Sequence, residues 1–207
     1  MFSSLRVITP PAPLASLDQV RRHCRVDSTY DDDLLASYLV AATEWAERYC
    51  NRAFLRQTLL YSITNAPAPT TTPYVPVSLI VFPLNWPPYI PQPVQLPRAP
   101  CVQLLEVLQG PVDQMEVVPP DHYIANLGVE PARVMMGPNL MPVLPASSLS
   151  FKFLAGEDDV AQVPATIRVA VLQLAAFMFE GRGDTNAEEP TSAWRLLAPH
   201  RLWQFSG

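Results

Sequence analysis

The chain has 207 residues, of which 49% are apolar and 16% are charged, and its formal net charge at pH 7 is −5. This composition can supply a hydrophobic core, and the acidic balance argues against a nucleic-acid-binding surface spread over the whole protein. The charged fraction lies below the roughly 25% of ordinary soluble domains, which indicates that partners cover part of the surface.

The three cysteines, Cys24, Cys50 and Cys101, have no CxxC spacing. We therefore expect neither a disulfide framework nor a zinc site, and a reducing compartment fits best. The first residues, MFSSLRVITPPAP, lack the long apolar stretch of a signal peptide. No apolar run reaches the ~18 residues of a membrane span, so no membrane partner is expected.

Residues 1–15 are predicted to form an extended N-terminal arm, and a short helix follows it. Ser16 can cap this helix, and Gln19 stands three residues later, at the spacing of a capping box. Arg21 and Arg22 belong to its basic side. For these arginines a solvated or subunit-facing position is favoured over contact with nucleic-acid phosphates.

The most regular stretch is VDSTYDDDLLASYLVAATEWAERYCNRAF, residues 26–54. Apolar residues recur there at spacings of three and four, which predicts a helix from about Asp32 to Cys50 with Asn51 as its stop. Carboxylates at a helix start favour the free N–H groups and the dipole. A calcium loop would need a glycine turn and a distal glutamate, which are absent. The acidic cluster is therefore assigned to helix capping rather than to a metal site, and it comprises Asp27, Asp31, Asp32 and Asp33.

The pattern changes to strand from Phe54 to Ile63. Residues 65–100 then form a proline-rich insertion, for which we predict a projecting loop with polyproline-like stretches. Within it, residues 77–82 could form a short edge strand. Further strand signals, separated by turn residues, predict a small antiparallel sheet, and they cover residues 102–108, 114–117, 122–124, 133–136 and 149–154.

The stretch VPATIRVAVLQLAAFMFEGRGD predicts a second long helix, with Pro164 at its start. Its apolar residues lie all round the helix, so it must be buried on more than one side. One set is predicted to face the helix at 34–49, namely Ile167, Ala170, Val171, Leu174 and Phe177. The other set needs a second cover, the sheet or a neighbouring subunit. With Arg21 and Arg22 it forms the hypothetical subunit interface, and it comprises Val169, Leu172, Ala176 and Phe179.

Residues 191–207 are too aromatic for a solvated tail, so they either pack on their own domain or dock into another chain. The residues concerned are Trp194, Leu196, Leu197, His200, Leu202, Trp203 and Phe205. The histidines His23, His122 and His200 lie in no HExxH motif and beside no GxSxG serine. With only 7 glycines the chain has no phosphate-binding loop. We predict no catalytic residue, no metal and no cofactor, and to this point the residues identify no function.

The order of the segments resembles the tailed-bacteriophage head-tail connector (adaptor) family, which is found also in prophages and gene transfer agents. ITPPAPLASLDQVRRHCRVD is similar to the Thr-Pro-Pro arm and SLDEAKxHLRVD helix of that family. LLASYLVAATEWAERYCNRAFLRQT is similar to its LIxAAxxWxExYxGRAL helix and the QT that follows. LPRAPCVQLLEV, VPATIRVAVLQLAAFMFEGR and LLAPHRLW resemble later motifs. Asn51 replaces the usual glycine, and about 65–92 has no counterpart.

The resemblance implies a structural virion protein at the head–tail interface, made in the host bacterial cytoplasm. Such adaptors form a homo-oligomeric ring, commonly of twelve copies, beneath the portal protein. The ring extends the channel through which genomic DNA passes without specific binding, and it docks the next neck or tail-completion protein. Residues 191–207 would engage the portal. A DNA-binding or other phage-encoded interaction module remains the alternative, and a small enzyme is less favoured.

For the fold we expect one connector domain over residues 1–207, of the α+β class. It would be mainly a helical bundle, made of two long helices and short N- and C-terminal helices. A small antiparallel sheet and the long proline-rich loop would complete it.

Overall fold

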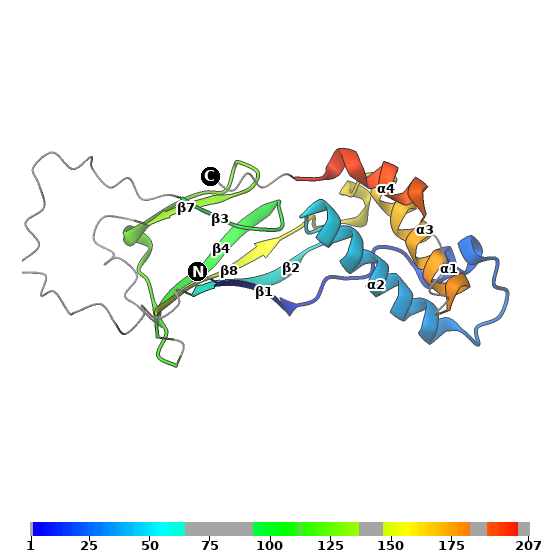
Figure 1. Cartoon of the computed structure of the whole chain (residues 1–207), viewed down its shortest axis with the longest axis horizontal. Coiled ribbons are helices and arrows are strands. Elements are labelled where there is room, and N and C mark those ends of the chain that lie inside the picture. The colour runs from blue at the N-terminus through cyan, green and yellow to red at the C-terminus, as the bar shows by residue number, and fades with distance from the viewer. Residues whose placement is uncertain (1, 65–92, 112, 137–146, 183–189, 203–207) are drawn as a thin grey trace, which may run out of the picture.

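The computed structural model describes residues 2–64, 93–111, 113–136, 147–182 and 190–202. This part of the chain is elongated, with the helices at one end and the strands at the other (Figure 1). Most of the predicted proline-rich loop, residues 65–92, lies outside the described residues, as do Trp203 and Phe205 of the predicted docking arm.

The helical end contains four α-helices within the described ranges: α1 (Leu17–Cys24), α2 (Asp32–Cys50), α3 (Ala165–Gly181) and α4 (Thr191–Leu197). Three short 3-10 turns occur at Pro120–His122, Val160–Gln162 and Ala198–His200. The predicted capping box is confirmed, because Ser16 Oγ accepts from the Gln19 N–H at 3.3 Å and Gln19 Oε1 accepts from the Ser16 N–H at 2.9 Å. The predicted bounds of α2 are also confirmed, and Asn51 ends the helix in the left-handed conformation with φ of 53°.

The first hydrophobic core lies between α2 and α3, with α1 and α4 packed around them. Leu35 and Leu39 of α2 are buried there, and so are four of the five residues predicted for this face of α3: Ile167, Ala170, Val171 and Leu174. The fifth, Phe177, is only half-buried. Burying side chains of this size contributes roughly 1.5–3 kcal/mol each. None of the helices in the described ranges is long and apolar enough to cross a membrane.

The larger sheet has five strands in the order β1-β2-β8-β4-β5, all antiparallel to their neighbours. The strands are β1 (Phe2–Thr9), β2 (Gln57–Thr64), β8 (Ser147–Ala155), β4 (Cys101–Pro111) and β5 (Glu116–Val117). The register of β4 against β8 shifts twice, between Cys101 and Gln103 and between Leu104 and Glu106. Residues of the predicted N-terminal arm thus form the edge strand β1.

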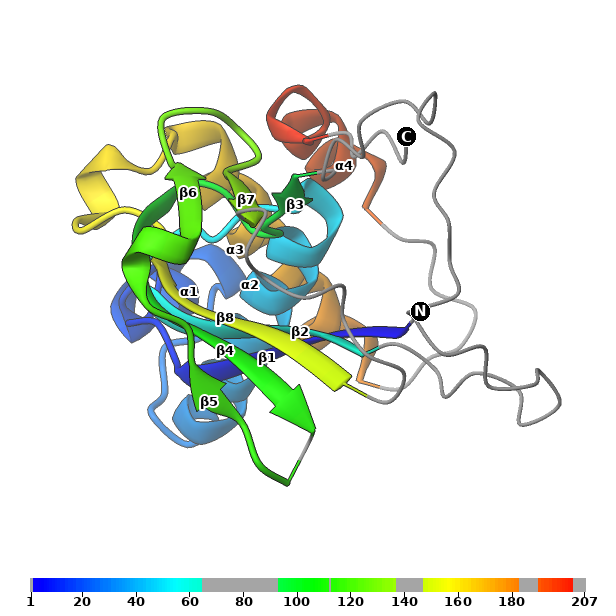
Figure 2. The same cartoon turned by 90° about the vertical axis from the view of Figure 1, so that its left-hand side faces the viewer.

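A second sheet of three strands has the order β3-β7-β6, with β3 (Val94–Gln95), β7 (Arg133–Met136) and β6 (Tyr123–Asn126). It lies over one side of the larger sheet (Figure 2). A second hydrophobic core joins them, in which Phe151 and Phe153 of β8 are fully buried together with Val134 of β7.

The predicted fold class is therefore wrong in its proportions. We expected mainly a helical bundle with a small sheet, whereas eight strands in two sheets, within the described residues, form one end of the molecule and enclose their own core. The strands predicted over residues 102–108 and 149–154 are too short, because β4 and β8 extend to 11 and 9 residues. Bulges interrupt the alternation of β4, so only part of that strand has a clear pattern.

Candidate functional site

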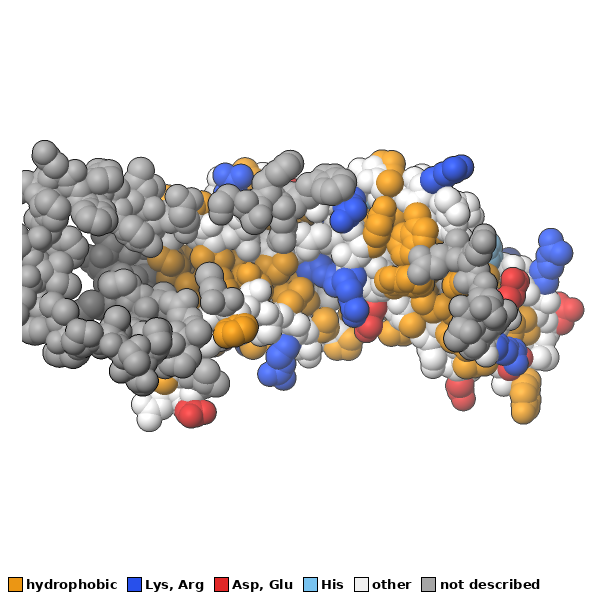
Figure 3. All heavy atoms as spheres, viewed as in Figure 1, with side chains coloured by type: hydrophobic (Ala, Val, Ile, Leu, Met, Phe, Trp, Pro, Cys, Tyr) orange, Lys and Arg blue, Asp and Glu red, His pale blue; other side chains and the backbone are white. Residues whose placement is uncertain are grey.

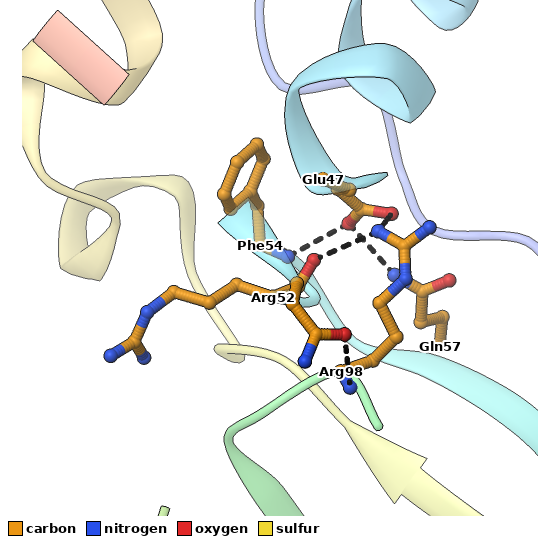
Figure 4. A network of polar contacts seen from close by, with 6 residues as sticks. Glu47, Arg52, Phe54, Gln57 and Arg98 are labelled. Carbon is orange, nitrogen blue, oxygen red and sulfur yellow. Dashed lines mark hydrogen bonds and ion pairs between the residues drawn. The ribbon is translucent and has the colours of Figure 1, made fainter. Parts of the chain in front are cut away.

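A buried polar network joins the helical end to the sheets (Figure 4). Its centre is Glu47, in the last turn of α2, whose side chain is buried. Glu47 Oε1 accepts from the backbone N–H of Phe54 and from Gln57 Nε2, both at 2.8 Å. The carboxylate thus links the end of α2 to the start of β2.

Arg98 lies on the other side of this carboxylate. Its Nη1 lies 3.6 Å from Glu47 Oε2 and donates to the carbonyl oxygen of Arg52 at 3.2 Å. Arg98 has a left-handed backbone with φ of 64°, and its N–H donates to Asn51 Oδ1 at 3.4 Å. Burial raises the pKa of Glu47 and lowers the pKa of Arg98, because removal from water disfavours both charged forms.

Arg52 carries the network to two further segments. Its Nε donates to the carbonyl oxygen of His200 at 2.8 Å, and its Nη2 donates to Glu130 Oε2 at 2.6 Å. We call this network, centred on Glu47, Arg52 and Arg98, the joint. Leu202 is held by the joint as well, because its N–H donates to the carbonyl oxygen of Cys50 at 2.9 Å. The network therefore fixes the helices, the large sheet, the loop before β7 and the C-terminal segment relative to one another.

These groups are arranged for structure rather than for reaction. Burial raises the pKa of Cys50 and of Cys101 to about 11, whereas a nucleophilic cysteine needs a depressed pKa. Within the described ranges no three His, Cys, Asp or Glu residues come together as metal ligands. What the joint can do is hold the two ends of the molecule at a fixed angle.

The predicted docking arm packs on its own chain as far as Leu202. Leu197 is completely buried in the helical core. Trp194 forms a tight aromatic cluster with Trp45 and Tyr49, at ring-centroid distances of 5.0 and 4.8 Å. Leu196 and Leu202 are half-buried, and His200 Nε2 lies 2.8 Å from Thr166 Oγ1. The docking of this arm to another protein stays a prediction.

The residues of the hypothetical subunit interface are divided between surface and core. Val169 is 42% exposed, Leu172 and Ala176 are half-buried, and Phe179 is buried against Tyr38. Arg21 and Arg22 line an open polar depression of about 500 Å³ around α1, together with Asp18, Arg25, Val26 and Asp27. Arg21 is ion-paired with Asp18 at 2.6 Å and with Asp32 at 3.3 Å. Its use in a subunit interface also stays a prediction.

Comparison with known proteins finds a family model that matches part of the chain. Residues 14–107 match the family model described as "Phage gp6-like head-tail connector protein". Over these residues, just under half of its length, the chain is similar to the gp6-like head-tail connector family. The match confirms the resemblance stated from the sequence, and with it the structural role and the location at the head–tail interface of the virion. No protein in the curated set matches the connector in a sequence search.

Solved structures contain chains similar to this connector. One is described as "Virion of native gene transfer agent (GTA) particle", at 18% identity, with 98% of each chain covered and a TM-score of 0.67. A second is "Neck of empty GTA particle computed with C6 symmetry", at 19% identity, covering 99% of this chain and 98% of the other, with a TM-score of 0.68. A third is "Neck of native GTA particle computed with C12 symmetry", at 19% identity, with the same coverage and a TM-score of 0.64. At these identities the likeness shows the fold.

Of the predicted acidic cluster, Asp32 and Asp33 lie in the first turn of α2, where carboxylates favour the helix dipole as predicted, but the expected side-chain cap is absent. Asp31 occupies the capping position without a capping hydrogen bond from its side chain. Asp31 Oδ2 instead lies 3.6 Å from Arg182 Nη2, and Asp32 Oδ1 lies 3.3 Å from Arg21 Nε. The cluster therefore joins α2 to α1 and to the end of α3 by ion pairs.

The central residue of the joint was not predicted from the sequence. Glu47 and Thr43 are both buried, although polar side chains of these types are mostly exposed in proteins. The available signal was spacing, because Glu47 follows Thr43 by four residues and precedes Cys50 by three, which puts all three on one helix face. Nothing in the sequence indicated Arg98 as the partner.

Proposed function

We propose that copies of this chain form a ring beneath the portal of a filled head. The ring extends the DNA channel and offers a docking surface to the next neck or tail-completion protein. The observation that carries this proposal is the family match over residues 14–107. A ring of twelve copies is supported by the fold shared with chains of a neck computed with C12 symmetry.

The surface of the helical end supports contact with a large partner. Apolar side chains gather there between α2 and α4 (Figure 3). The aromatic cluster of Trp45, Tyr49 and Trp194 is half-buried, so part of each ring still faces outward. Tryptophan and tyrosine are enriched among residues that dominate protein interfaces. We assign this surface to the portal, together with Leu196, His200 and Leu202 of the predicted docking arm.

The charges suit a conduit through which DNA slides. Among the described residues, five arginines are ion-paired with acidic side chains of the same chain, namely Arg21, Arg52, Arg56, Arg98 and Arg182. Paired arginines make fewer contacts with phosphates, and each phosphate contact would add to the affinity for DNA. Together with the net charge of −5, this favours weak and sequence-independent contact with the passing genome.

The role needs no chemistry, and the family is one of structural phage proteins. Two rivals are separated by simple measurements. A DNA-binding module would bind duplex DNA with strongly salt-dependent affinity. An enzyme would lose turnover on alanine substitution of His23, His122 or His200.

The portal assignment is tested by co-sedimentation of the purified protein with portal. Truncation after Ala193 is not a suitable variant, because it removes Leu197 from the core. Truncation after Leu202 and the substitution Trp194→Ala keep that residue. Both should reduce binding to portal at least tenfold while the chain stays folded, whereas the exposed-site control Arg133→Glu should bind normally. Normal binding by both variants would remove the portal assignment.

A further inference from the structure

Helices α2 and α3 form the central pair of the helical end, where they pack side by side (Figure 1). They run antiparallel, because Arg182 at the end of α3 is ion-paired with Asp31 at the start of α2. The apolar residues between the two helices are buried in the first hydrophobic core. The far side of each helix therefore points away from the other helix, and the two far sides face in opposite directions.

The far side of α2 carries an exposed strip with an apolar centre. Val40 is 55% exposed there, and it lies one helical turn from Glu44, which is also exposed. Trp45 and Tyr49 lie on another side of the helix, against Trp194 of α4. We call the exposed residues the α2 strip, and they are Ser37, Val40, Ala41, Glu44 and Arg48.

The far side of α3 carries a second strip. Successive residues of an α-helix are about 100° apart, so Val169 points almost opposite to the buried Ile167. Val169 is 42% exposed. We call this set the α3 strip, and it comprises Ala165, Thr166 and Val169, which are exposed, and Leu172 and Ala176, which are half-buried. Three of these residues belong to the subunit interface predicted from the sequence, which lacked a partner surface.

The two strips are placed as a closed ring requires. Such a ring is built from heterologous contacts, which need two different surfaces on each copy. The α2 strip and the α3 strip are different surfaces, and they face in opposite directions. In a ring of twelve, consecutive copies are rotated by about 30°. The α2 helix of one copy therefore stays nearly antiparallel to the α3 helix of the next, as it is within one chain.

The strips are also complementary in charge. Within the described ranges neither Glu44 nor Arg168 forms an ion pair, and the buried Nε of Arg168 lacks a hydrogen-bond partner there. If antiparallel packing places Val169 opposite Val40, then Arg168 lies opposite Ala41. Glu44 is three residues farther along α2, about 4.5 Å along the helix axis, which two long side chains can span.

We infer that neighbouring copies in the ring join through their helical ends: the α3 strip of one copy packs antiparallel against the α2 strip of the next, with Val169 opposite Val40 and Arg168 beside Glu44. The occupant of each strip is thus a second copy of this chain. The inference rests on the proposed ring and names the surfaces by which the ring closes. The aromatic cluster assigned to the portal lies on another side of α2 and stays available.

Disulfide trapping on the protein mixed with portal tests the pairing directly. In a Cys24→Ser background, the variant carrying both Val40→Cys and Val169→Cys should give a ladder of covalent multimers beyond the dimer on oxidation. The two strips face away from each other, so this disulfide cannot form within one chain. Neither single variant should give the ladder, and a mixture of the two should stop at dimers that contain one of each. Dimers from Val40→Cys alone would show that α2 pairs with α2, and would overturn the inference.

A second cysteine pair determines the direction of packing. The antiparallel arrangement places Glu44 opposite Ala165, so Glu44→Cys combined with Ala165→Cys should also give the ladder. A parallel arrangement would instead bring Glu44 opposite Gln173, so Glu44→Cys combined with Gln173→Cys should give none. The reverse result would contradict the antiparallel contact.

Charge reversal provides the third arm, read by electron microscopy of rings assembled with portal. Glu44→Arg should lower ring formation at least tenfold, because the repulsion from Arg168 is repeated at every contact round the ring. Arg168→Glu should act likewise, and the double reversal should recover most of the loss. If Arg168→Glu unfolds, Glu44→Arg at its exposed position still carries this arm. The control Arg133→Glu, exposed on β7, should assemble normally.

The outcomes separate the inference from the proposed function. Rings that form equally in all charge variants, with no ladder from either predicted cysteine pair, would remove the contact between helical ends and leave the connector role intact. A wild-type protein that forms no ring with portal would remove both.

Discussion

Glu47 Oε1 accepts a hydrogen bond from the backbone N–H of Phe54 at 2.8 Å, and this contact joins the last turn of α2 to the first residues of the sheet. Glu47→Ala would leave that N–H, the Gln57 amide and the Arg98 guanidinium without their acceptor in a buried site. Removing one partner of a buried charge pair costs about 3–5 kcal/mol. Urea unfolding should show a loss of this size.

Two variants make that result specific. Glu47→Gln keeps one acceptor oxygen and should cost less, about 1–2 kcal/mol. Glu44→Ala, at an exposed position three residues earlier, should stay within about 0.5 kcal/mol of wild type. Equal stability of Glu47→Ala and Glu44→Ala would mean that the joint does not hold the two ends together.

The stability contributed by Glu47 should depend on pH. Burial raises the pKa of its carboxyl above the ordinary value of 4.5, so the folded state binds a proton more readily than the unfolded state. Stability from this group is therefore fully present below the unfolded pKa and is lost as pH rises through the folded pKa. Between pH 4 and pH 7 the free energy of unfolding of wild type should fall relative to that of Glu47→Gln. An opposite slope would contradict the raised pKa.

Gly156 stands where a side chain has no room. Its φ is +93°, and a Cβ would lie 2.2 Å from the carbonyl oxygen of Leu55. Gly156→Ala should therefore destabilise the protein by about 1–3 kcal/mol or more, measured as the shift in thermal or urea unfolding. Gly128→Ala is the matched control, because its Cβ would meet only Asn126 Oδ1 at 3.7 Å. Similar losses at both glycines would show that the close approach to Leu55 is not what constrains Gly156.

The C-terminal helix should contribute to the core of the connector. Leu197 is completely buried, whereas its neighbour Leu196 is half-buried. Leu197→Ala should cost about 2–5 kcal/mol, because it leaves a cavity. Leu196→Ala should cost less. Equal and small losses in calorimetry would mean that α4 is not a fixed part of the helical core.

The helical end of the molecule was largely predictable from the sequence. The bounds of α2 follow from the spacing of its apolar residues and from Asn51, and α1 follows from the Ser16–Gln19 pair. These signals are local, because helix hydrogen bonds and caps involve residues a few positions apart. The buried face of α3 was also predicted, since Ile167, Ala170, Val171 and Leu174 recur at helical spacing.

The sheets and the joint depend on contacts that are distant in the sequence. β1 is exposed along almost its whole length, so its residues show no alternation, and its strand structure comes from pairing with β2, which follows only after α1 and α2 in the chain. Glu47 and Arg98 meet because the chain turns at Asn51 and again at Arg98, both with positive φ. No spacing rule indicates such a pair. The extent of the sheet was underestimated because strand pairing likewise joins residues that are distant in the sequence.

The central claim is that this protein acts as a ring-forming connector, and electron microscopy of the purified protein mixed with portal tests it most directly. The proposed function predicts a ring of twelve copies seated on the portal, with each copy matching the described fold. Particles of portal alone, beside monomers that do not associate at micromolar concentrations, would contradict it.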